Sequence, residues 1–128
     1  MVDINNHPAR SADNQVKATA HLGLEEIVHI ANKVGLEFVE AKRLAEYYAL
    51  MKPTVRARIM LRLDNEKLSE AKLLRLTETD PEYLNFLEKL SNAKREADRL
   101  KIRYESYKNL FEARRSVLSY KKAEMNLY

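Results

Sequence analysis

The fold is decided by residues 83–128, which read YLNFLEKLSNAKREADRLKIRYESYKNLFEARRSVLSYKKAEMNLY. An apolar stripe runs through this stretch with alternating spacings of three and four residues, and only Arg114 and Lys121 in it are polar. Such a long seven-residue repeat predicts one helix that packs lengthwise on another helix. The stripe consists of Tyr83, Phe86, Leu90, Ala93, Ala97, Leu100, Tyr104, Tyr107, Phe111, Arg114, Leu118, Lys121, Met125 and Tyr128.

The start of this long helix is marked by Asp80, Pro81 and Glu82. They match an N-cap, a proline at the first helical position and an acid in the first turn. We therefore predict a helix over about 81–126 within a segment 80–128. At 1.5 Å per residue, it would be roughly 70 Å long.

Shorter helices are predicted for residues 13–79, after a flexible arm at 1–12. The first helix would run from Asp13 or Asn14 to Val34, because its apolar residues share one face and Gly35 suits a helix C-terminus. A second helix would cover about 36–51, and Pro53 would end it.

Residues 55–63 allow two interpretations. Val55, Ala57, Ile59, Leu61 and Leu63 alternate with mostly basic residues, which is the period of a strand. No other segment offers a partner strand, however, and a lone strand is unstable. We therefore predict a helix that either continues or breaks near 64–65, another helix over about 68–76, and a linker at 77–79.

Together these elements predict an all-α protein, a helical bundle with one long C-terminal helix of coiled-coil character. Two Gly and three Pro in 128 residues are few for a turn-rich β architecture. The absence of Cys excludes disulfides and thiolate chemistry. The sequence has no run of apolar residues long enough for a membrane span and no secretory-signal pattern at its start, so we expect a cytoplasmic location.

The partner of the stripe is left open by the sequence. A homo-oligomeric coiled coil and an antiparallel hairpin within one chain both fit, because the repeat mixes aromatic residues, Ala and Leu. In either case the aromatic residues of the stripe are expected in a core. The predicted helix–helix contact consists of Phe86, Leu90, Leu100, Tyr104, Tyr107, Phe111 and Leu118.

Five bases flank the stripe at one heptad position; this basic flank consists of Lys94, Lys101, Lys108, Arg115 and Lys122. One interpretation is a series of phosphate contacts. The other is local pairing of each lysine with the acid four residues later, Asp98, Glu105 or Glu112. We favour local pairing for the three lysines.

Past Glu112 such acids are lacking, so a distal basic patch is the leading candidate for nucleic-acid or partner binding. It consists of Arg114, Arg115, Tyr120, Lys121 and Lys122. Two of its members interrupt the stripe, which predicts that packing within the chain stops near residues 111–118. The alternative is that the C-terminal end of the helix is solvated and frayed and has no binding role. A second basic set consists of Arg56, Arg58 and Arg62.

Catalysis is not indicated by any motif. His7, His21 and His29 lack the spacing of a zinc site, and phosphate loops, nucleophile elbows and dinucleotide fingerprints are absent. Adjacent acids such as Glu25 and Glu26 diverge on a helix. We predict a non-enzymatic protein without metal or cofactor.

The C-terminal run from Arg103 to Met125, with Phe111-Glu112-Ala113-Arg114-Arg115-Ser116 at its centre, resembles small helical phage-encoded accessory proteins of replication and recombination modules. This resemblance implies a non-catalytic accessory of DNA transactions. We therefore expect a binding or assembly protein that associates with itself and binds DNA through its basic helix end. A phage-type inhibitor or adaptor of a protein and a structural particle subunit are the alternatives.

Overall fold

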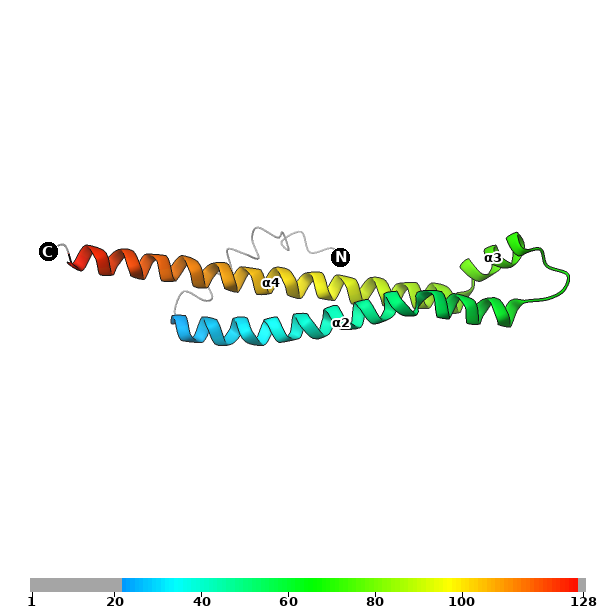
Figure 1. Cartoon of the computed structure of the whole chain (residues 1–128), viewed down its shortest axis with the longest axis horizontal. Coiled ribbons are helices and arrows are strands. Elements are labelled where there is room, and N and C mark those ends of the chain that lie inside the picture. The colour runs from blue at the N-terminus through cyan, green and yellow to red at the C-terminus, as the bar shows by residue number, and fades with distance from the viewer. Residues whose placement is uncertain (1–21, 127–128) are drawn as a thin grey trace, which may run out of the picture. The chain divides into compact units, whose positions relative to one another are not determined.

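The computed structural model describes residues 22–126, and this part of the chain forms three helices (Figure 1). They are α2 (Leu24–Leu63), α3 (Glu70–Glu78) and α4 (Pro81–Asn126). Residues 22–126 contain no strand, so the all-α prediction is confirmed. The described residues form two compact units, 22–36 with 101–126 and 37–100, and α2 and α4 contribute to both.

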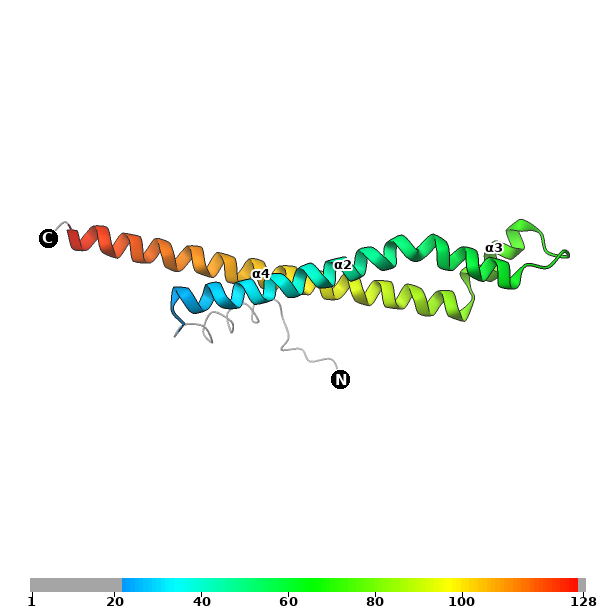
Figure 2. The ribbon, with the colours of Figure 1, turned by 60° about the horizontal axis from the view of Figure 1, so that its bottom comes forward.

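In the first unit, the beginning of α2 lies antiparallel to the later half of α4, as both views show (Figures 1 and 2). Ile27 and Val34, which are about two turns apart on α2, are almost completely buried. Tyr107 of α4 is buried as well. The unit therefore depends on a narrow apolar contact between two helices.

The second unit joins the remainder of α2, the short α3 and the beginning of α4. Its core is formed by Val55, Ile59 and Tyr83, and Met51, Leu63, Phe86 and Leu87 pack against it. The rings of Tyr48 and Phe86 add an edge-to-face contact with centroids 6.0 Å apart.

The stripe of α4 is the buried side of this helix from its start to Phe111. Its members at 83, 90, 93, 97, 100 and 107 are buried, and Phe86, Tyr104 and Phe111 are half-buried. In each unit the helix that covers the stripe is α2 of the same chain. The hairpin within one chain is therefore the arrangement that the structure adopts.

Gly35 does not end a helix, so the boundary predicted there is wrong. It lies inside α2 without positive φ. A Cβ placed on Gly35 would lie 3.1 Å from Cε2 and 3.2 Å from Cδ2 of Tyr104. The missing side chain therefore lets the ring of Tyr104 approach the backbone of α2, which is a packing reason for glycine and not a conformational one.

Pro53 does not end a helix either, since it lies inside α2. Its ring removes one backbone hydrogen bond and costs about 3 kcal/mol in a helix interior. Met51 on one side of Pro53 and Val55 and Ile59 on the other belong to the same apolar contact with α4. Packing of both flanks on one partner helix keeps α2 continuous, and tertiary contacts override the local signal.

Thr77 was expected in a linker, but it is buried in the last turns of α3. Its hydroxyl donates a hydrogen bond of 2.8 Å to the carbonyl of Leu73, which satisfies the polar group in place. The N-cap of α3 is Ser69, whose side chain accepts from the amide of Lys72. The predicted linker is therefore shortened to Thr79 and Asp80.

Residues 55–63 are helical, which confirms the interpretation that we favoured. Val55 and Ile59, four residues apart, are buried, while Leu61 is 78% exposed. The alternation of the sequence therefore places apolar residues on two sides of one helix. Of the two outcomes that the sequence leaves open at Asp64 and Asn65, the structure has the break, since α2 ends at Leu63.

Some predictions fall outside the described residues. They are the arm at 1–12, the start of the first helix at 13 or 14, and Tyr128. The described part of α2 begins after Gly23, whose amide donates to the carboxylate of Glu26 at 3.1 Å.

Replacement of Gly35 by Ala tests the packing role of this glycine. An exposed helical Gly→Ala change stabilises by about 0.5–1 kcal/mol, but here the ring of Tyr104 must move. We expect Gly35→Ala to lower the free energy of unfolding by about 1 kcal/mol, measured by urea denaturation. In a Tyr104→Ala background the same change should be stabilising. Equal stabilisation in both backgrounds would show that the ring does not restrict this position.

Candidate functional site

The second basic set pairs with acids at the junction of α3 and α4. Nη2 of Arg56 lies 3.2 Å from Oε1 of Glu78, and Nη2 of Arg58 lies 2.6 Å from Oε1 of Glu82. Both arginines come from α2, so these ion pairs connect residues more than 20 positions apart. These acidic partners could not be recognised from the sequence, because only the fold brings them to α2.

Arg62 and Asp80 form the most enclosed of these ion pairs. Nη2 of Arg62 lies 2.7 Å from Oδ2 of Asp80 and 3.5 Å from Oε2 of Glu82. Oδ2 of Asp80 also accepts the amide of Glu82 at 3.0 Å, as expected of the N-cap of α4. The hydrogen bond from Arg62 is the main reason that the pKa of Asp80 lies below its ordinary value.

These contacts change the interpretation of the second basic set. Each of Arg56, Arg58 and Arg62 has a carboxylate within 3.2 Å. Their charges are offset within the second unit, and they hold α2 next to the turn that starts α4. They are therefore weaker candidates for phosphate contacts than bases without such neighbours.

The lysines of the basic flank do not form the local pairs that we favoured. Within residues 22–126, no carboxylate lies within the 4.0 Å limit of an ion pair from Lys94, Lys101 or Lys108. Exposed pairs of this kind contribute only about 0.2–0.5 kcal/mol each, so solvation of the two charges competes with pairing. All three lysines are exposed.

The opposite order does give a close pair on the same helix. Glu96 precedes Arg99 by three residues, and two hydrogen bonds of 2.8 and 3.0 Å join them. This contact lowers the pKa of the Glu96 carboxyl. Three further acids of α4, Asp98, Glu105 and Glu112, also precede a base by three residues but form no ion pair among residues 22–126. The order of acid and base along the helix therefore does not by itself decide which charges on α4 are paired.

Arg114 differs from the rest of the distal basic patch. It is half-buried, and its Nη1 donates a hydrogen bond to the backbone carbonyl of Leu22. The two residues border a groove of about 340 Å³ in the first unit. Arg114 therefore has a role in joining the start of α2 to α4. The groove is lined by Leu22, Gly23, Leu24, Arg114, Val117 and Leu118.

The other members of the distal basic patch face outward. Arg115, Lys121 and Lys122 are exposed, and Tyr120 is 70% exposed. None of the three bases lies within 4.0 Å of a carboxylate in the described part of the chain. The partial compensation of Lys121 that Glu124 could provide is therefore not formed.

Apolar side chains share this end of α4. Val117 and Leu118 are each 52% exposed, and Met125 is 78% exposed. The stripe is thus half-buried at Phe111 and exposed at Leu118, which confirms that packing within the chain stops between them. We call residues 115–126 the distal segment, since every residue in it is exposed.

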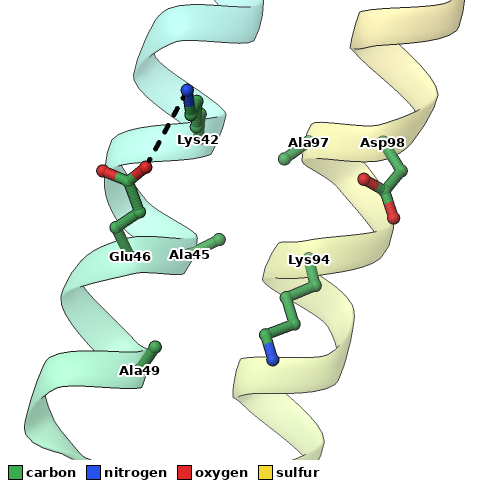
Figure 3. A pocket seen from close by; sticks show the side chains of 7 residues that line it. All are labelled: Lys42, Ala45, Glu46, Ala49, Lys94, Ala97 and Asp98. Carbon is green, nitrogen blue, oxygen red and sulfur yellow. Dashed lines mark ion pairs between the residues drawn. The ribbon is translucent and has the colours of Figure 1, made fainter.

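A gap between α2 and α4 in the second unit has no catalytic character. It measures about 260 Å³, and the side chains of Ala45 and Ala97 point into it from opposite helices (Figure 3). Glu46 pairs with Lys42 on α2 at 4.0 Å, while Asp98 belongs to α4. These acids lie on opposite sides of the gap and do not converge on one point.

Metal-ligand types do not gather in the part of the chain that the structure describes. Residues 22–126 contain no group of three or more His, Cys, Asp and Glu side chains placed to hold a metal ion. His29 is exposed, and His7 and His21 lie outside the described residues. None of the helices described is long and apolar enough to cross a membrane.

Comparisons with protein-family models, with curated proteins and with solved structures give no match to this chain.

The Arg62–Asp80 contact predicts a pH-dependent contribution to stability. Because the pKa of Asp80 is lowered on folding, the contribution is present above the ordinary carboxyl pKa and is lost as pH falls through the lowered value. Asp80→Asn keeps a capping side chain but removes the charge. We expect it to lower the unfolding midpoint at pH 7, and the deficit to shrink below about pH 4. Thermal unfolding followed by circular dichroism measures both.

The matched control is Asp98→Asn, because Asp98 forms no ion pair among residues 22–126. It should leave the unfolding midpoint nearly unchanged at both pH values. If the midpoint of Asp80→Asn stayed below that of the wild type by the same amount from pH 7 to pH 2, the charge of Asp80 would not be the source of the stabilisation.

Proposed function

We propose that the protein is a non-catalytic binding protein whose distal segment contacts an anionic macromolecule, with nucleic acid as the first candidate. The proposal is carried by three exposed bases that form no ion pair with any carboxylate of residues 22–126, namely Arg115, Lys121 and Lys122. Bases of this kind can neutralise phosphates and release counterions. An accessory role in DNA replication or recombination accords with the resemblance to phage-encoded proteins.

The geometry of α4 supports this proposal. On a helix, Arg115 and Lys122 are seven residues apart and lie on one side, about 10 Å from each other. Lys101 and Lys108 continue the same side within the first unit. An exposed tyrosine at position 120 supplies a ring on which an unpaired base could stack.

A protein partner is the second candidate, and a separate observation favours it. Leu118 and Met125 continue the apolar stripe beyond the part that is buried in the chain, and the exposed Val117 lies beside Leu118. Such a face suits an apolar groove in another protein, as in helix-in-groove recognition. An inhibitor or adaptor of this type would bind independently of nucleic acid.

Charge reversal in the distal segment tests the first candidate. We expect the wild-type chain to bind labelled single- or double-stranded DNA, with affinity falling about 10- to 100-fold between roughly 50 and 200 mM salt for three phosphate contacts. The combined change Arg115→Glu, Lys121→Glu and Lys122→Glu should abolish binding in fluorescence anisotropy. Arg114 is left in place because its contact with Leu22 is structural.

The control carries the same change of charge elsewhere: Lys67→Glu, Lys72→Glu and Arg95→Glu. These three residues are exposed and belong to the second unit. The control should retain most of the affinity if the site is local. Equal losses in both triple variants would indicate an effect of net charge alone. Absence of binding at about 50 mM salt would contradict the nucleic-acid candidate and favour the protein partner.

A further inference from the structure

The distal segment is a helix whose whole circumference is open to solvent. Each residue from 115 to 126 is exposed, including Val117 and Leu118, which border the groove beside Leu22. At 1.5 Å per residue the segment is about 18 Å long, and a helix with its side chains is about 10–12 Å wide. The major groove of B-form DNA is about 12 Å wide and admits one α-helix. The dimensions and the exposure of the distal segment therefore suit a major groove.

The three bases of the distal segment lie on two sides of this helix. At 100° per residue, Lys122 lies about 20° from Arg115 around the helix axis, whereas Lys121 lies about 120° from Arg115. All three are exposed, and none forms an ion pair with a carboxylate of residues 22–126. A helix in the major groove has a phosphate backbone on each side, so bases on two sides neutralise phosphates of two strands.

Apolar side chains lie between these two groups of bases. Leu118 and Met125 are about 60–80° from Arg115 and about 40–60° from Lys121 around the helix axis. They are 52% and 78% exposed. Glu124, the one acid of the distal segment, lies about 100–120° from both of them. When the bases reach the two strands, the side of the helix that faces the base edges is therefore apolar.

A single strand fits the arrangement of the distal segment less well. Proteins that bind single strands combine phosphate contacts with stacking of bases on aromatic rings. Tyr120 is the one aromatic residue of the distal segment, and it lies about 140° from Arg115 and about 160° from Lys122 around the axis. A strand that follows Arg115 and Lys122 therefore runs on the side of the helix away from this ring.

We propose that the distal segment binds double-stranded DNA by lying in its major groove. Arg115 and Lys122 contact one strand, and Lys121 contacts the other. Leu118 and Met125 face the base edges, where thymine presents a methyl group that apolar side chains can contact. Because these two side chains form no hydrogen bonds with bases, the segment prefers thymine and does not recognise one defined sequence. This inference rests on the proposed function, since it uses the same bases, and it adds the form of nucleic acid and the groove.

Fluorescence anisotropy of the full chain at about 50 mM salt tests this proposal. Three labelled probes share one sequence: a DNA duplex rich in A·T pairs, the same duplex with uracil in place of thymine, and the thymine-containing single strand. We expect the thymine duplex to bind at least about 10-fold more tightly than the single strand, because only the duplex offers phosphates on both sides of the helix. Uracil should lower the affinity about fourfold for each methyl group that leaves a contact.

The variant that carries both Leu118→Ala and Met125→Ala removes the apolar contacts and keeps all three bases. It should bind the thymine and uracil duplexes equally, while its dependence on salt stays that of the wild type. The matched control is Val117→Ala, because Val117 is as exposed as Leu118 but lies about 100° from it around the helix axis. This control should keep the preference for thymine. Circular dichroism checks that both variants are folded.

The outcomes separate this proposal from the proposed function. Absence of binding to all three probes would contradict both. Binding of the single strand as tight as that of the duplex, or tighter, would leave the anionic site in place and overturn the assignment to the major groove. Equal affinity of the wild type for the thymine and uracil duplexes would also overturn it, and so would a preference for thymine that the double alanine variant retains.

Discussion

In both units the packing of the apolar stripe of α4 on α2 determines which surfaces of the chain are available for binding. The stripe is buried or half-buried from Tyr83 to Phe111 and is exposed at Leu118 and Met125. Because the chain provides no further described helix for these last turns, bases and apolar side chains both reach solvent there. The proposed binding function follows because the stripe extends further along α4 than the part on which α2 packs.

The basic residues divide into two groups according to their neighbours. Arg56, Arg58 and Arg62 face acids at the α3–α4 junction, and their charges contribute to holding that junction together. The lysines on one side of α4 are exposed and lack such neighbours among the described residues. A net charge of +4 therefore understates how unevenly uncompensated charge is distributed along the chain.

Much of this fold could be predicted from local signals in the sequence, and the exceptions have physical reasons. The N-cap at Asp80 and the heptad repeat were sufficient to predict α4, since both act within a few residues. Gly35 and Pro53 looked like boundaries because their roles depend on distant contacts, with Tyr104 in one case and with the core around Ile59 in the other. Composition alone placed the candidate site at the C-terminal end of α4, where the described side chains are exposed. The contact between Arg114 and Leu22, 92 residues apart, could not be inferred from spacing.

The central claim is that packing within the chain ends between Phe111 and Leu118, so that the distal segment is free to bind. Hydrogen exchange of the backbone amides of α4, measured at neutral pH and low protein concentration, tests this claim most directly. The account predicts strong protection from about Leu87 to Phe111 and rapid exchange over 115–126, as expected of helix without tertiary contacts. Protection of residues 115–126 as strong as that of the stripe near Leu100 would contradict it.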